Sequence, residues 1–147
     1  MANPNSNRNG RAAADVLLQA MMTVYGIAKV RAAWEGVPKP VLLQAWGEAL
    51  DAYPLLWLEI VAREMPHRLD AEGKREQWPP ALPEVLDMLD SIGKRLRRVR
   101  HHYPELREAS PGLVTQLAHD LTREFPHMTA AEQGRMLRAS FPQLTVA

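Results

Sequence analysis

The sequence predicts an all-α protein, a compact bundle of about five or six helices. Apolar residues recur at spacings of three and four along most of the chain, which is the period of an amphipathic helix. Proline, glycine and capping residues divide the chain into segments of helical length, and no β-hairpin signal is present. A chain of 147 residues with 46% apolar content can bury one core without disulfides or metal.

The first ten residues are expected to form a disordered, flexible arm. Four of them are Asn, and ordering this segment would cost entropy because it offers little apolar surface for burial. The remaining residues, 11–147, are expected to form a single helical domain.

Residues 11–34 form the first predicted helix. Leu17 and Met21 lie on its apolar stripe, and Gly36 follows its end, where glycine commonly stops a helix. Gly26 lies inside the segment and lowers its helix propensity by about 1 kcal/mol relative to alanine. It marks either a break in the helix or a close contact with another helix.

Two further helices are predicted over residues 40–53 and 55–65. Pro40 suits the first position of a helix, and Pro54 separates the two helices because proline disrupts a helix interior. The segment 55–65 is so rich in apolar residues that we expect it to be the central helix of the bundle. Residues 67–83 hold prolines, a glycine and several charges, which indicates a connecting loop with room for one short turn.

The segment after Pro83 has the clearest helical pattern in the chain. Its apolar residues cover about a third of the helix circumference. Its first turns are acidic and its last turns are basic, an order that the helix dipole stabilises. The carboxylates of Glu84, Asp87 and Asp90 could also gather a cation, but the dipole accounts for them without a ligand.

Two shorter helices complete the predicted bundle. Ser110 and Pro111 supply an N-cap and a first-turn proline for a helix that reaches Phe125. Thr129 and Glu132 have the spacing of a capping box and open the last helix.

The composition excludes several classes of functional site. Without cysteine, the chain has no disulfide, no Cys-ligated metal and no thiol nucleophile. The five histidines lack the spacing of a helical metal pair, and no nucleotide-binding loop or serine-hydrolase motif is present. We therefore expect a non-enzymatic protein without catalytic residues, metal or cofactor. Because no apolar run is long enough for a membrane span or a signal peptide, we expect a cytoplasmic protein without a membrane partner.

The charge of the chain is small overall but uneven. A net charge of +1 excludes a strongly basic nucleic-acid coat. Residues 1–93 carry nine Lys and Arg against twelve Asp and Glu, whereas residues 94–147 carry nine against five. Basic residues between 94 and 102 form one face of the helix after Pro83. This face can bind phosphates or an acidic protein surface, and the alternative is a solvated face without a partner. The predicted binding residues are Lys94, Arg97, Arg98, Arg100 and His101.

The tryptophans divide into core and loop residues. Trp46 lies on an apolar stripe and is expected to pack in the core. Trp78 lies in the proline-rich loop, where it either stacks on Pro79 and Pro80 or serves as a recognition anchor for a partner.

Three segments of the chain stand out by their order and spacing: YGIAKVRAAWEG (25–36), LLQAWGEAL (42–50) and WPPALPEVLDML (78–89). In this order and spacing, they resemble the phage replication proteins of the lambda P type. Proteins of this family load the bacterial replicative helicase. The resemblance covers about residues 24–92 and leaves 93–147 as a basic helical C-terminal part. Gly36 and Leu50 occupy two of the matching positions. The other matching positions, which we also consider possible partner anchors, are Trp34, Trp46, Trp78, Pro79, Pro80, Leu82, Pro83 and Glu84.

The resemblance implies a helical module that docks on the hexameric replicative helicase of a bacterial host and helps place it on single-stranded DNA. On this hypothesis, the basic face contacts the DNA or an acidic surface of the helicase. One alternative is a small phage protein that inhibits or hijacks a host machine, including in an anti-defence role. Another is a structural module that forms oligomers through the apolar segment 55–65.

Overall fold

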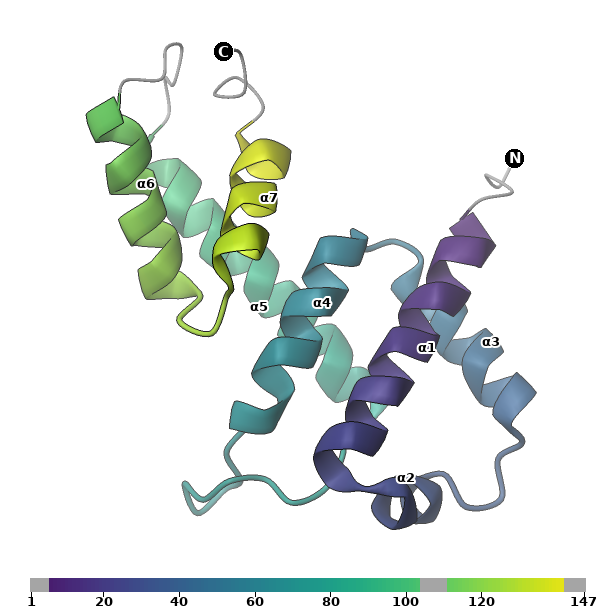
Figure 1. Ribbon diagram of the computed structural model, residues 1–147. Helices are drawn as coiled ribbons and strands as arrows, with labels where there is room; N and C mark the ends of the chain where they lie inside the picture. Colours follow the sequence, from purple (N-terminus) through teal and green to yellow (C-terminus); the bar gives the residue numbers. More distant parts are fainter. Residues whose placement is uncertain (1–5, 104–110, 142–147) are drawn as a thin grey trace. The chain divides into compact units, whose positions relative to one another are not determined.

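A computed structural model describes residues 6–103 and 111–141 of the chain. The described residues form seven α-helices and one short 3₁₀ helix, without a β-strand. The all-α class is therefore confirmed (Figure 1). The chain divides into two compact units, residues 1–89 and 90–147, and the boundary falls within helix α5 (Leu82–His101).

The first unit is built around α1 (Ser6–Tyr25), which packs against α3 (Lys39–Leu50) and α4 (Leu55–Glu64) (Figure 1). A short 3₁₀ helix, η1 (Met65–His67), continues directly from α4. The fully buried large side chains of this unit are Leu17, Met21, Leu50, Leu58, Ile60, Met65 and Leu89.

The segment predicted as one helix over residues 11–34 forms two helices. α1 already begins at Ser6, so it includes the second half of the predicted arm, and residues 1–5 lie outside the described residues. Gly26 ends α1 with φ 91°, and α2 (Ile27–Ala33) follows. Within the described part of the chain, a Cβ added to Gly26 would meet nothing within 4 Å. Of the two interpretations of Gly26, the break is therefore correct, because its positive φ is strained for other residues.

Prolines mark the starts of the next two helices. Pro38 is the N-cap of α3 and Pro54 is the N-cap of α4, both with extended backbone. Pro40 is the second residue of α3, one position later than predicted. A proline there loses no helical hydrogen bond, because the first N–H groups of a helix have no intrahelical acceptor.

The loop between η1 and α5 contains one ordered turn, as the sequence pattern allowed. Asp70 Oδ1 accepts hydrogen bonds from the backbone N–H groups of Glu72 and Lys74, each at 2.9 Å. Gly73 supplies a positive φ of 79°, and Leu69 and Arg75 form an isolated antiparallel bridge. The turn fixes the course of the chain through its own hydrogen bonds.

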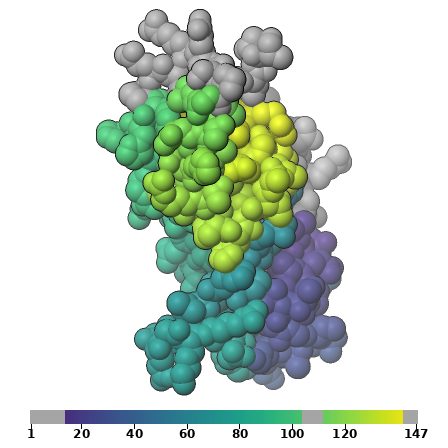
Figure 2. Space-filling model, turned by 60° about the vertical axis from the view of Figure 1, so that its left-hand side comes forward, coloured from purple at the N-terminus to yellow at the C-terminus, as the bar shows by residue number. Residues whose placement is uncertain are grey.

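The second unit contains the rest of α5 together with α6 (Pro111–Glu124) and α7 (Ala130–Ser140), and α6 and α7 lie side by side (Figures 1 and 2). The predicted capping box of α7 is present, with Thr129 Oγ1 accepting from the Glu132 N–H at 3.2 Å. The predicted N-cap Ser110 lies outside the described residues. The buried apolar residues of this unit are Ile92, Leu96, Val99, Leu117, Leu121, Phe125, Met136 and Phe141.

Candidate functional site

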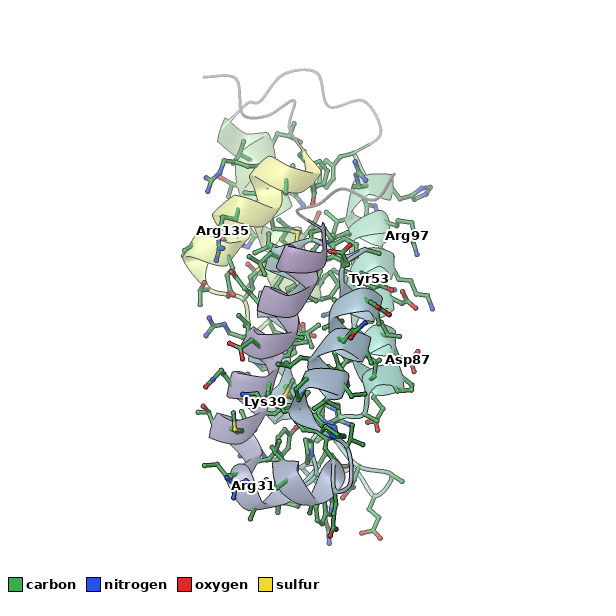
Figure 3. All side chains as sticks on the ribbon, turned by 90° about the vertical axis from the view of Figure 1, so that its right-hand side faces the viewer. Arg31, Lys39, Tyr53, Asp87, Arg97 and Arg135 are labelled. Carbon is green, nitrogen blue, oxygen red and sulfur yellow. The ribbon has the colours of Figure 1, made fainter. Side chains whose placement is uncertain are left out.

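The second half of α5 carries the basic face predicted from the sequence. Its apolar side is buried through Ile92, Leu96 and Val99, so the residues on the opposite side face solvent. Figure 3 shows Arg97 projecting away from the helix ribbon. All predicted members of the face are exposed: Lys94, Arg97, Arg98, Arg100 and His101.

Arg98 differs from the other members of the basic face because it is paired with Glu124 of α6. Its Nη2 lies 2.9 Å from Glu124 Oε2, and its Nε donates to Glu124 Oε1 at 3.2 Å. This hydrogen-bonded pairing raises the pKa of Arg98 and lowers the pKa of Glu124. Among the described residues, Lys94, Arg97 and Arg100 form no ion pair, so their charge is open to a partner.

A shallow, open hollow of about 470 Å³ lies along the basic face. Most of its lining residues are basic or histidine, and the carboxylate among them, Glu124, is already engaged by Arg98. Such a surface attracts anions, whether phosphate groups or carboxylates. The lining residues are Lys94, Arg97, Arg98, His101, His102 and Glu124.

Arg95 belongs to the same basic run but has a structural position. Its Nη1 donates to the backbone oxygen of Glu124 at 3.0 Å, and its guanidinium carbon lies 4.5 Å from the centre of the Phe125 ring. The last carbonyl groups of a helix lack intrahelical donors and carry the negative end of the dipole. Arg95 therefore stabilises the end of α6 and holds Glu124 beside the basic face.

A second contact ties the end of α5 to α6. The Tyr103 hydroxyl donates a hydrogen bond to Asp120 Oδ2, and Asp120 Oδ1 lies 3.4 Å from Arg123 Nη2. Burial, reinforced by the hydrogen bond to Asp120, raises the pKa of Tyr103 to about 12. Periodicity alone could not reveal the contact between Tyr103 and Asp120, because Tyr103 follows the end of α5 and Asp120 lies on α6.

Two of the segments that carry the resemblance meet through their tryptophans. The ring centres of Trp34 and Trp46 lie 5.6 Å apart, with an angle of 78° between the ring planes. Edge-to-face pairs of this kind add to the stability that burial provides. Trp46 is only 6% exposed and Trp34 is partly exposed, so Trp34 forms the outer wall of this contact.

Arg68, which no sequence motif singled out, holds the third segment in place. Its Nη1 donates to the Trp78 backbone oxygen at 3.3 Å and to the Tyr25 hydroxyl at 3.4 Å. Its Nη2 forms an ion pair with Glu84 in the first turn of α5. The sequence pattern did not predict this cluster, because its members are far apart in the sequence and meet only when the chain folds.

Trp78 itself is an exposed aromatic residue with a cation beside it. It is 53% exposed, and Lys29 Nζ lies 5.7 Å from the centre of its ring. The neighbouring motif residues differ in their burial: Pro80 is buried, Pro79 and Leu82 are half-buried, and Pro83 is exposed.

The described residues contain no group of three or more His, Asp or Glu that could hold a metal ion. No helix in the same part of the chain is long and apolar enough to cross a membrane. Comparisons with protein-family models, with curated proteins and with solved structures found no match to this chain.

Proposed function

We propose that this protein is a non-enzymatic accessory factor of phage DNA replication, which binds the replicative helicase of a bacterial host and helps to load or regulate it. The resemblance of segments 25–36, 42–50 and 78–89 supports this proposal. Segment 25–36 contacts both of the other segments within the first unit, through the Trp34–Trp46 pair and through Lys29 beside Trp78. Segments that fold against one another support a common origin as one module better than scattered matches would.

The observation that carries the partner assignment is the exposed basic face of α5. Lys94, Arg97 and Arg100 present charges that no described carboxylate neutralises. In the proposed function, these residues contact the phosphates of single-stranded DNA or an acidic surface of the helicase. Both contacts are electrostatic, so binding weakens as the salt concentration rises.

The test mixes the full-length protein with the purified host helicase, with and without ATP, and follows the complex by size exclusion with light scattering. We expect a co-eluting complex that weakens in the charge-reversal variant Lys94→Glu/Arg97→Glu. The matched control is Lys74→Glu/Arg138→Glu, which changes the net charge equally at two exposed positions outside the basic face. We expect this control to bind like the natural protein.

Absence of a complex at protein concentrations on the order of ten micromolar would overturn the proposal, because the Kd would then lie above that concentration. If the complex forms, helicase unwinding assays distinguish a loader from an inhibitor. Equal binding by the two double variants would exclude the basic face as the contact.

A further inference from the structure

The first unit contains an apolar pocket where α1, α2 and α3 meet. It has a volume of about 340 Å³ and opens to solvent. Leu18 and Met22 of α1, Val30 of α2, Trp34 after it, and Leu42 of α3 form much of its wall. The pocket exists because Gly26 breaks the helix, so that α2 turns away from the axis of α1 (Figure 1).

Apolar surface continues beyond the mouth of the pocket. Ile27 and Val37 line the pocket and are nevertheless 53% and 45% exposed. Single exposed apolar residues are ordinary, but a group of them around a concavity marks a docking surface. An occupant that covers these residues is larger than the pocket itself.

Two cations complete the lining. Arg31 of α2 and Lys39 at the start of α3 both line the pocket, and Figure 3 labels both. Within the described part of the chain, neither has a carboxylate partner, and the pocket lining includes no acidic residue. The complementary group is an anion placed directly beside an apolar one.

We propose that this pocket binds a short segment of a partner protein, which inserts one bulky apolar side chain and places an Asp or Glu beside it. The volume accommodates a large side chain, and the main chain of the segment covers the exposed parts of Ile27 and Val37. A free amphipathic carboxylate could fill the pocket but has no main chain to cover the outer surface of these two residues. The inference goes beyond the proposed function, since it uses none of the basic face of α5 and requires no helicase.

The test selects peptides from a displayed library of random linear sequences on the immobilised full-length protein. We expect the enriched peptides to share a bulky apolar residue next to Asp or Glu. A synthetic copy of an enriched peptide should shift the indole N–H resonance of Trp34, assigned with Trp34→Phe. Arg31→Glu/Lys39→Glu should weaken its binding about tenfold or more, because two ion contacts at the pocket rim are lost and each is replaced by a repulsion.

The matched control is Lys74→Glu/Arg138→Glu, which changes the net charge by the same amount at two exposed positions outside both the pocket and the basic face. It should leave peptide binding unchanged, so that a general charge effect is excluded. Circular dichroism and thermal unfolding check that each variant is folded. If charge reversal impairs folding, Arg31→Gln/Lys39→Gln replaces it, since glutamine keeps the length of the side chains without adding negative charge.

Three results would overturn the inference: no enriched peptide, enriched peptides without an acidic residue, or equal peptide binding by Arg31→Glu/Lys39→Glu. Octanoate serves as a small-molecule probe. If octanoate shifts the Trp34 resonance while no peptide is enriched, the pocket takes small amphipathic anions and the assignment to a protein segment is wrong. Because peptide selection and helicase binding are separate experiments, failure of either proposal leaves the other measurable.

Discussion

The hydrogen bond from Tyr103 to Asp120 joins the end of α5 to α6 through one proton. Asp120 is already an anion beside Arg123, so ionisation of the phenol would place two negative oxygens next to each other in a partly buried position. Burial and this hydrogen bond therefore raise the pKa of Tyr103 to about 12. Because the pKa is raised in the folded state, the contact contributes stability below pH 10 that is lost as the pH rises through about 12.

We expect Tyr103→Phe to remove one phenol of raised pKa from the ultraviolet tyrosinate signal. The difference between the natural protein and this variant should have its midpoint near pH 12. At neutral pH the variant should lose about 1 kcal/mol of unfolding free energy, measured by denaturant titration, because it leaves Asp120 with one partner fewer. A difference midpoint near pH 10 would contradict the assigned environment.

The pairing of Arg98 with Glu124 has the opposite pH dependence. The hydrogen bond from Arg98 lowers the pKa of Glu124 below its ordinary value of 4.5. The pair therefore contributes stability above that pH, and the contribution is lost as the pH falls through the lowered pKa. We expect Arg98→Ala to move the pKa of Glu124 upward, as measured by NMR titration of its carboxyl carbon.

Arg97→Ala is the matched control for the Glu124 titration. Arg97 is exposed, as Arg98 is, but forms no ion pair with any described residue. Its removal should leave the Glu124 midpoint almost unchanged. Equal shifts in the two variants would mean that the pKa of Glu124 reports the general charge of the face rather than one hydrogen bond.

At the scale of elements, the break at Gly26 separates α1 from α2 and thereby opens the apolar pocket. Its φ of 91° is accessible to glycine but strained for alanine, and an added Cβ would touch nothing among the described residues. We therefore expect Gly26→Ala to destabilise the protein by about 1–2 kcal/mol through backbone strain alone. Thermal and denaturant unfolding measure this loss.

Gly134→Ala provides the control of opposite sign. Gly134 lies inside α7 without a positive φ, and an added Cβ would meet only the flexible end of Arg138 at 3.5 Å among the described residues. This substitution should stabilise the protein, by up to about 1 kcal/mol, because alanine favours helix. If both substitutions had the same sign, the backbone argument for Gly26 would fail.

Across the whole molecule, the features that could be predicted from the sequence are those that depend on residues close together in the chain. Pro54 separates two helices, and Thr129 and Glu132 form their capping box, because both effects depend on residues close in the chain. The helix that was not predicted separately is α2, which begins after Gly26. At this glycine the sequence pattern was compatible both with a break in the helix and with a close contact to another helix. Which of the two occurs depends on backbone torsion, which residue spacing does not report.

The candidate sites could be predicted only in part for the same reason. The basic face of α5 follows from helical periodicity, and its exposure agrees with that pattern. The capture of Arg98 by Glu124, the cluster around Arg68 and the apolar pocket all join residues far apart in the sequence. Such contacts depend on tertiary packing, so a single sequence contains no periodic signal for them.

The burial of α4 bears on the oligomeric state of the whole chain. An oligomer formed through segment 55–65 needs apolar side chains on the surface, but Leu58, Ile60 and Val61 are at most 2% exposed. Leu55 is 49% exposed, and Leu56 and Trp57 are only partly exposed, which leaves too little apolar surface on this helix for a stable interface. We therefore expect light scattering to give a mass near 16.6 kDa, independent of concentration. The contrary result is a mass that rises with concentration to twice this value and that Leu55→Ser returns to the monomer mass. This result would restore the segment as an interface, because only a dimer that uses this helix would respond to that change.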